Sequence, residues 1–263
     1  MRKIAVTNQK GGVGKTTLAF NLSSGLASMG YKVLVIDCDP QGNITVSFIH
    51  PKDLRSNILS IFQEKENSLS PQKIRENLWL AGANIHLAKV ERDTQFDIVY
   101  RLREALENLK DSFEWVFFDC PPSLGYLTLN ALNAADTVLI PIQPSYYPLE
   151  GTSDLIETIT KVQKRLNNEL KILGFVLTLF DTRTTLSREV EETLRKGFKN
   201  LIFDTKITKS VKLEEAPAHK QSIFEYAPKS KSVAQFQELV EEFLERMGEK
   251  GKRYAQRKSA FRT

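Results

Sequence analysis

Short, uninterrupted apolar segments alternate along the chain with longer segments in which apolar residues recur every three or four positions. Uninterrupted segments are typical of strands buried on both faces of a parallel sheet, and the longer period is typical of helices that bury one face. We expect strands at 4–8, 32–37, 115–119, 137–142 and 172–179, and helices at 15–29, 54–64, 94–109, 127–135, 150–166, 186–199, 210–216 and 232–247. Residues 68–84 show neither period and are expected to be irregular, with a short strand at 85–88. The alternation predicts an α/β fold, with a mostly parallel, doubly wound sheet flanked by helices.

The length of the chain favours a single folded domain. With 263 residues, of which 41% are hydrophobic, the chain can bury one sizeable core, which we place in residues 1–247. Residues 248–263 contain two glycines and few apolar residues, so we expect a disordered tail. No apolar run approaches about 18 residues, and Met1 leads directly into the first strand without an apolar leader. We therefore expect a cytoplasmic protein.

The net charge of +5 is concentrated at the carboxyl end of the chain. Residues 248–263 carry six basic residues and one glutamate, which leaves residues 1–247 with no net charge. A second local excess lies at 206–231, where six lysines face three glutamates. Clusters of this kind favour an anionic polymer or surface as partner.

The cysteines and histidines give no sign of a metal centre or a disulfide. Cys38 and Cys120 each follow an acidic residue at the end of an expected strand, where a small buried side chain is the expected role. The chain has no C-x-x-C pair, and its three histidines are scattered.

A glycine-rich turn joins the first strand to the first helix in the segment KIAVTNQKGGVGKTT, residues 3–17. Free backbone N–H groups converge at a helix N-terminus, and glycines let the backbone approach a phosphate closely. Lys15 can then reach the β- and γ-phosphates, while the Thr16 hydroxyl can ligate Mg²⁺. The segment predicts a site for a nucleoside triphosphate.

This turn departs from the ordinary P-loop pattern G-x-x-x-x-G-K-[ST]. Gln9 stands where the first glycine belongs, and a second lysine appears at Lys10. The segment resembles the deviant Walker A motif, K-G-G-x-x-K-[ST], of the ParA/MinD class of P-loop ATPases.

Carboxylates stand at the ends of two further expected strands. Asp37 and Asp39 follow the second strand in IDCDPQGN, and Asp119 closes the strand WVFFD before Pro-Pro turns the chain out of the sheet. Ligands of open α/β sheets bind at the carboxyl ends of strands, so these carboxylates should face the phosphate loop. A hydrophobic strand ended by aspartate is the Walker B arrangement, which places a carboxylate near Mg²⁺.

Five motifs in order resemble those of the ParA/Soj chromosome and plasmid partition ATPases, and the resemblance covers residues 4–247. They are QKGGVGKTT, IDCDPQGN, FFDCPPSLG, PIQPSYYPLEG and KSVKLEEAP. The resemblance implies a Mg²⁺-dependent ATPase, weak without its partner, of the short Soj-like branch. It also implies an ATP-bound sandwich homodimer that binds double-stranded DNA without sequence preference, and a ParB-type centromere-binding protein that stimulates hydrolysis and releases the DNA. Such a protein would associate with the nucleoid.

The resemblance also assigns roles to single residues. Lys10 reaches across to the phosphates of the partner subunit, Gly11 lies where the closing subunits approach, and Asp39 orients or activates the attacking water. Lys15 and Thr16 hold phosphate and Mg²⁺. The resemblance implies that the nucleotide is bound by Lys10, Gly11, Gly12, Val13, Gly14, Lys15, Thr16, Thr17, Asp181 and Pro217, of which the last two contact the base. It implies that the metal is held by Thr16, Asp37 and Asp119, with the aspartates acting through water. It implies that DNA is bound by Lys209, Lys212 and Lys229.

Several alternatives stay open at this point. A second interpretation of the three lysines is that they lie on a solvated helical face and bind no DNA. Tyr146 and Tyr147 serve either an interface or ordinary packing. The tail is a DNA tether, a membrane-surface segment as in MinD relatives, or a solubilising segment; its few apolar residues make membrane contact the less favoured. A MinD-like membrane-associated positioning ATPase is the main alternative function. A nitrogenase-iron-protein-like relative lacks cluster ligands here, and a nucleotide-binding scaffold without turnover is the remaining possibility.

Overall fold

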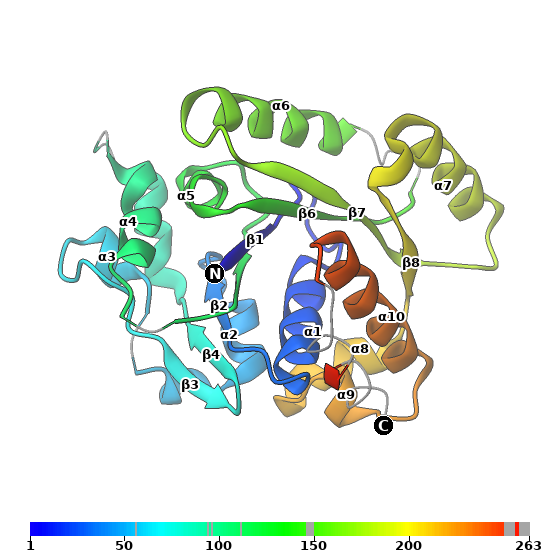
Figure 1. Cartoon of the computed structure of the whole chain (residues 1–263), viewed down its shortest axis with the longest axis horizontal. Helices are drawn as coiled ribbons and strands as arrows, with labels where there is room; N and C mark the ends of the chain where they lie inside the picture. Colours follow the sequence, from blue (N-terminus) through cyan, green and yellow to red (C-terminus); the bar gives the residue numbers. More distant parts are fainter. Residues whose placement is uncertain are drawn as a thin grey trace.

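The architecture is an eight-stranded sheet covered by helices on both faces (Figure 1). The computed structural model describes residues 1–55, 57–93, 95, 97–110, 112–145, 150–249, 256 and 257. The strand order is β3-β4-β2-β5-β1-β6-β7-β8, and every neighbouring pair is parallel except β3 with β4. The strands are β1 (Arg2–Val6), β2 (Val33–Asp37), β3 (Gln72–Arg75), β4 (Leu78–Ala81), β5 (Trp115–Asp119), β6 (Thr137–Ile142), β7 (Lys171–Phe180) and β8 (Ile202–Thr208). The predicted α/β class with a mostly parallel, doubly wound sheet is confirmed.

The helices form two layers, one on each face of the sheet (Figure 1). One layer contains α1 (Lys15–Ser28), α2 (Asn43–Phe48), α8 (Val211–Glu215), α9 (Ile223–Tyr226) and α10 (Lys231–Arg246). The other contains α3 (Leu59–Phe62), α4 (Arg101–Glu107), α5 (Tyr126–Ala134), α6 (Glu150–Arg165) and α7 (Thr185–Phe198). Short 3₁₀ helices lie at Pro51–Asp53, Ile85–Arg92, Ile98–Tyr100, Lys199–Leu201 and Ala216–His219. Within the described ranges, no helix is long and apolar enough to cross a membrane.

Each central strand sends alternate side chains into two separate apolar cores. In β2, Val33 and Val35 join the core beneath α1 and α10, whereas Leu34 and Ile36 join the core on the opposite face. Because both faces are covered, the strand needs apolar residues at successive positions, which explains the uninterrupted apolar runs in the sequence. Aromatic packing fixes α10 to the sheet, with the Phe243 and Trp115 ring centroids 5.3 Å apart.

The structure differs from the predicted helices and strands mainly near β3, at one edge of the sheet. The helix expected at 54–64 shortens to α3, and the segment 68–84, expected to be irregular, contains the antiparallel pair β3 and β4. The sequence analysis missed these strands because β3, an edge strand, is made mostly of polar residues and the turn between the strands, at Asn77 with φ 59°, contains no glycine or proline. The expected helix 94–109 includes Thr94 and Phe96, which lie outside the described residues; its described part is 3₁₀ and then α4.

The short strand predicted at 85–88 was wrong, because this segment begins a 3₁₀ helix. The Asn84 side chain caps the helix by accepting a hydrogen bond from the backbone N–H of His86 at 3.1 Å. The Ile85 side chain is 60% exposed, whereas a strand at 85–88 would be expected to bury this large apolar residue. The apolar residues of this segment suggested a strand, but the Asn84 cap stabilises a helical turn instead.

Two further expectations concern residues that the structure describes in part or not at all. Tyr146 and Tyr147 lie outside the described residues, so their expected interface or packing role stays a prediction. Of the basic segment 248–263, only residues 248, 249, 256 and 257 are described. The boundary of a single domain at residue 247 also stays a prediction.

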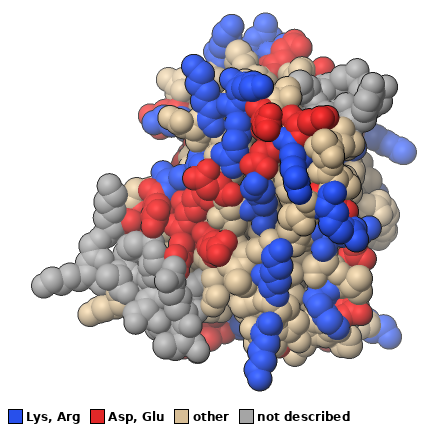
Figure 2. All heavy atoms as spheres, turned by 90° about the vertical axis from the view of Figure 1, so that its right-hand side faces the viewer, with Lys and Arg blue, Asp and Glu red and all other residues tan. Residues whose placement is uncertain are grey.

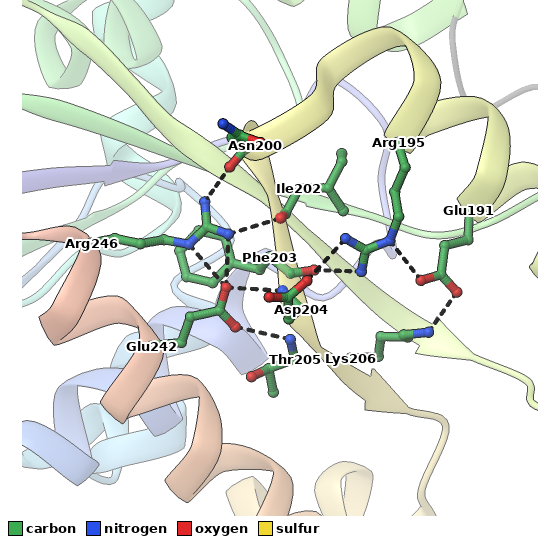
Figure 3. A network of polar contacts seen from close by, with 10 residues as sticks. All are labelled: Glu191, Arg195, Asn200, Ile202, Phe203, Asp204, Thr205, Lys206, Glu242 and Arg246. Atoms are coloured by element: carbon green, nitrogen blue, oxygen red, sulfur yellow. Dashed lines mark hydrogen bonds and ion pairs between the residues drawn. The ribbon is translucent and has the colours of Figure 1, made fainter.

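Side chains from two helices cover the free edge of β8, which the sequence analysis did not identify as a strand (Figure 3). Glu242 of α10 accepts hydrogen bonds from the backbone N–H groups of Asp204 and Thr205, both at 2.9 Å. Arg246 donates to the carbonyl oxygens of Asn200 and Ile202, at 2.7 and 2.8 Å. These bonds occupy backbone groups that a further strand would otherwise pair with, and they suppress edge-to-edge association.

The first prediction tests this edge. Glu242→Ala removes the acceptor of two backbone N–H groups and the partner of Arg246, so we expect the free energy of unfolding to fall by about 1–2 kcal/mol in urea denaturation. Glu242→Gln, which keeps one carbonyl oxygen, should lose less. Glu238→Ala, at an exposed position of the same helix, is the matched control and should change stability little. Equal losses in the two alanine variants would contradict the role of the carboxylate.

Candidate nucleotide site

The predicted phosphate loop lies at the carboxyl edge of the sheet, between β1 and α1. Gly12 and Gly14 have φ angles of 72° and 85°, a conformation that residues with a Cβ rarely adopt. Gly14 immediately precedes α1, whose first turn carries no acidic residue, so its free N–H groups and positive dipole end favour an anion. The Thr178 hydroxyl, from β7, donates to the carbonyl oxygen of Val13 at 2.7 Å and fixes the loop to the sheet.

Lys15 and Thr16 point their polar atoms toward the site. The Lys15 side chain is largely buried, and its Nζ donates to the carbonyl oxygen of Lys10 at 3.0 Å. Burial lowers the pKa of Lys15, and the nearby carboxyl of Asp119 opposes that shift. The Thr16 hydroxyl donates to Oδ2 of Asp119 at 2.8 Å. The two side chains expected to hold phosphate and metal are thus positioned beside the end of β5.

Asp37 and Asp119 are fully buried and occupy paired register positions on adjacent strands. Asp37 accepts two hydrogen bonds from Thr45, from its N–H at 3.0 Å and its hydroxyl at 2.6 Å, and one from the N–H of Asp39 at 3.0 Å. Burial raises the pKa of Asp37 to about 7 and raises the pKa of Asp119 well above its usual range, with the charge of Asp37 adding to the latter shift. Ionising both groups therefore requires a compensating positive charge.

The residues present fit a magnesium ion. Oδ1 of Asp119 is buried and has no hydrogen-bond partner among the described residues, so a cation or polar group there would satisfy it. Both oxygens of Asp37 already accept hydrogen bonds, which suits contact through water. Within the described part of the chain, no group of three or more His, Cys, Asp or Glu residues is arranged to hold a metal. Mg²⁺ typically uses one or two carboxylates together with substrate phosphates, and Thr16, Asp37 and Asp119 match that requirement.

Asp39 borders the cavity in front of the phosphate loop. This cavity has a volume of about 420 Å³ and is also lined by Gly12, Lys15, Thr16 and residues of three other loops. The Asp39 side chain is held by the N–H of Gln41, which donates to its Oδ1 at 2.9 Å. A carboxylate in this position can bind a water molecule beside the phosphates.

A second cavity, of about 230 Å³, adjoins the first at Gly14 and Thr17 and is lined mainly by apolar atoms. Pro217, predicted to contact the base, lies in its lining together with Leu213. An apolar slot next to a phosphate site suits a flat nucleobase. Asp181, the other predicted base contact, is not among its lining residues. Its carboxylate pairs with Arg183 at 2.8 Å, and the hydrogen bonds from Arg183 lower its pKa to about 2.

Sequence reasoning missed several residues that shape the site. Thr178 ties down the loop, Thr45 binds Asp37, and Asn8 donates through its amide to the carbonyl oxygen of Pro141 at 2.7 Å. Thr45 lies eight residues after Asp37, at a spacing that no motif of the sequence marks. Asn8, at the end of the first strand, was the one detectable signal, because ligand sites gather at strand ends.

Lys10 differs from Lys15, because its side chain is exposed, whereas Gly11 lines the phosphate cavity. The Lys10 Nζ donates to Oγ of Ser145 at 3.0 Å, and Lys10 lines neither cavity. A Cβ built on Gly11 meets no atom within 4 Å, so space around this residue is open.

Comparison with known proteins decides the family. A family model described as an AAA domain matches residues 1–172. The chain is 42% identical to the sporulation initiation inhibitor protein Soj of Bacillus subtilis, over 91% of this chain and 96% of Soj. It is 40% identical to the chromosome partitioning protein ParA of Myxococcus xanthus, over 93% of this chain and 88% of that protein. The chain belongs to the Soj/ParA family of chromosome-partitioning ATPases.

A solved structure related to this Soj/ParA family member contains a nucleotide. It is a protein from Mycobacterium smegmatis, named cobyrinic acid a,c-diamide synthase, with bound ADP and magnesium. The two chains are 36% identical, with a TM-score of 0.75, over 83% of this chain and 91% of the other. The phosphate loop and buried carboxylates described above are consistent with nucleotide and Mg²⁺ binding in this family.

The predicted DNA-binding lysines of this Soj/ParA family member occupy different settings. Lys209 and Lys229 are exposed, and Lys209 also lines the phosphate cavity. Lys212 forms an ion pair with Glu215 at 2.9 Å, and its Nζ lies 5.5 Å from the ring centroid of Tyr226. Glu215 therefore offsets part of the positive charge of this group.

The second prediction tests the metal assignment. Asp119→Asn removes the buried carboxylate with the unpartnered oxygen, so the gain in nucleotide affinity on adding Mg²⁺ should fall by about 10–100-fold. Binding of a fluorescent ADP analogue with Mg²⁺ or with EDTA measures this gain. Because burial disfavours the charged form of Asp119, the variant should stay folded without ligand. Asp204→Asn, at a side chain that is 89% exposed, is the control; an undiminished Mg²⁺ effect in Asp119→Asn would refute the assignment.

Proposed function

We propose that the protein is an ATP-driven DNA-partition switch. Two ATP-bound subunits close face to face, the closed dimer binds double-stranded DNA without sequence preference, and a ParB-type partner accelerates hydrolysis and releases the DNA. The observation that carries the proposal is the exposed Lys10 beside the open space at Gly11, on the same loop that holds the buried phosphate-binding Lys15. The nucleoid is then the expected location of the ATP-bound form.

The two lysines of the loop support a dimer. Lys15 is buried within its own site, whereas Lys10 is exposed and lies outside both cavities. A cation of this kind is available to a second phosphate loop that approaches Gly11. Neutralising the phosphates of the partner only after closure would link assembly to phosphoryl transfer.

The carboxylates support hydrolysis at the same site. Asp39 lines the phosphate cavity, so in this proposal it holds the attacking water. Mg²⁺ supplies positive charge to the phosphates when bound, and Thr16 and Asp119 would hold it. Lys15 stabilises the charge that develops on the transferred phosphoryl group.

Exposed basic side chains supply a surface for DNA. Figure 2 shows Lys and Arg in a band over the face that contains α7, β8 and α10, with Asp and Glu gathered mainly to one side. Lys209 and Lys229 are exposed, and the Lys209 ammonium lies close enough to the Asp181 carboxylate to contribute to lowering its pKa. Paired across a dimer, such groups give binding that weakens with salt and ignores sequence.

The third prediction concerns DNA binding. In fluorescence anisotropy with a non-specific duplex, ATP should increase affinity at least about 10-fold over ADP, and the affinity should fall steeply with salt. Gly11→Val adds a side chain where a Cβ meets no atom of the monomer within 4 Å, so it should lose the ATP-dependent gain; ATP affinity is measured alongside, because Gly11 also lines the phosphate cavity. Gly197→Val, at an equally open position of α7, should behave as wild type.

Either of two results would count against this proposal. Equal DNA affinity with ATP, ADP and no nucleotide would exclude a nucleotide-gated surface, and ATP-dependent binding to anionic vesicles without DNA binding would favour the MinD-like alternative.

The fourth prediction concerns turnover. Asp39→Asn keeps a side-chain oxygen for the N–H of Gln41 but removes the charge, so phosphate release should fall about 10²-fold or more while ATP binding stays within a few-fold of wild type. Phosphate release and nucleotide affinity are measured in the same preparation. Wild-type turnover in this variant would exclude Asp39 from the reaction.

A further inference from the structure

Four residues line both the phosphate cavity and the apolar cavity, so they mark the junction between the two. They are Gly14 of the phosphate loop, Thr17 of α1, Leu179 of β7 and Glu214 of α8. In a nucleotide the sugar joins the base to the phosphates. With the base in the apolar cavity and the phosphates beside Lys15, the ribose therefore lies at this junction.

Glu214 carries the one charged side chain among the four junction residues. Gly14 has no side chain, and the side chain of Leu179 is hydrocarbon. An ionised carboxylate only accepts hydrogen bonds, so it cannot bind phosphate oxygens but suits the hydroxyl groups of a sugar. Dinucleotide-binding α/β folds use an acidic side chain for a ribose hydroxyl in the same way.

The carboxylate of Glu214 is available to a ligand. It is exposed, and within the described part of the chain no side chain or backbone group forms a hydrogen bond or an ion pair with it. The next residue differs, because Glu215 pairs with Lys212 at 2.9 Å and accepts a hydrogen bond from the Tyr226 hydroxyl at 2.9 Å. The two adjacent glutamates therefore have separate roles, one holding α8 and one facing the junction.

The neighbours of Glu214 hold it in place. Leu213 is only 7% exposed and belongs to the core beneath α1 and α10. Glu215 links α8 to α9 through Tyr226. Because α8 is held on both sides of Glu214, its carboxylate is positioned before a nucleotide arrives, and little ordering is required on binding.

Leu179 supplies an apolar surface at the same junction, from an unusual backbone conformation. Its φ angle is 51°, which is uncommon for a residue with a Cβ, and the register between β7 and β8 shifts between Leu177 and Phe180. Conformations of this kind persist where the surrounding structure fixes them, and they gather at ligand sites. The Leu179 side chain can pack against a sugar ring but cannot recognise its hydroxyl groups.

We propose that Glu214 determines the sugar specificity of the nucleotide site. Its carboxylate accepts hydrogen bonds from the ribose hydroxyls, while Leu179 packs against the ring. The site then selects ribonucleotides, because an analogue without a hydroxyl leaves the carboxylate without its donor. The inference rests on the proposed function, since it requires a nucleotide that spans both cavities, and it adds a specificity residue to that site.

The first test compares the affinities of ADP, 2′-deoxy-ADP and 3′-deoxy-ADP, each with Mg²⁺, by isothermal titration calorimetry. The wild type should bind ADP at least about 10-fold more tightly than one of the two analogues, because a hydrogen bond to a charged group is lost. Glu214→Ala should bind all three with nearly equal affinity. Glu215→Gln removes the same charge one residue away and lines neither cavity, so it should discriminate as the wild type does.

Two results would overturn the inference: equal affinities for all three nucleotides in the wild type, or undiminished discrimination in Glu214→Ala. Absence of any nucleotide binding by the wild type would refute the site itself and the inference with it. The proposed switch is judged separately, by DNA affinity at saturating ATP, and its ATP-dependent gain should persist in Glu214→Ala. A wild type without that gain but with sugar discrimination would refute the switch alone.

The second test separates the carboxylate from the shape of the junction. Leu179→Ala removes apolar contact with the ring, so it should weaken the binding of ADP and of both analogues by a similar few-fold factor and keep the discrimination. If Leu179→Ala abolished the discrimination and Glu214→Ala kept it, the selection would arise from the shape of the cavity, and the role proposed for Glu214 would be wrong.

Discussion

The parallel register of β2 and β5 places two buried carboxylates side by side, and the site depends on this constraint. Asp37 and Asp119 occupy matching positions, and burial opposes the charge of each. Two ionised groups in such a place require positive charge or hydrogen-bond donors nearby. Thr45 supplies donors to Asp37, whereas one oxygen of Asp119 has none. The fold thus holds an incomplete polar arrangement, which Mg²⁺ with nucleotide phosphates would complete.

The sequence specifies most of this arrangement because its parts are local in the chain. An apolar strand followed directly by a glycine turn or an aspartate predicts both the buried strand and the polar residue at its end. The strand β5 was predicted with its observed bounds for this reason, and the positions of Lys15 and Thr16 follow from the start of α1.

The parts that escaped prediction depend on contacts between distant segments. The strand β8 contains polar residues at alternate positions, and the side chains of α10 that bind its free edge lie 37 to 46 residues further along the chain. The apolar cavity joins Gly14 to Pro217 across about 200 residues of chain, and no periodicity signals such a contact. The site for Arg257 is similar, because Gly30, Glu114 and Arg257 meet only in the folded protein.

The surroundings of Lys10 and Arg257 distinguish the two edges of the sheet. At the carboxyl edge, Lys10 is exposed beside Gly11 and donates to Ser145, so its effect in the proposed dimer depends on the arrival of a second subunit with its nucleotide. At the amino edge, Arg257 is already held by Glu114 and Tyr31, so this contact requires no such event. A hydrolysis step that opens the dimer would therefore remove the first contact and leave the second.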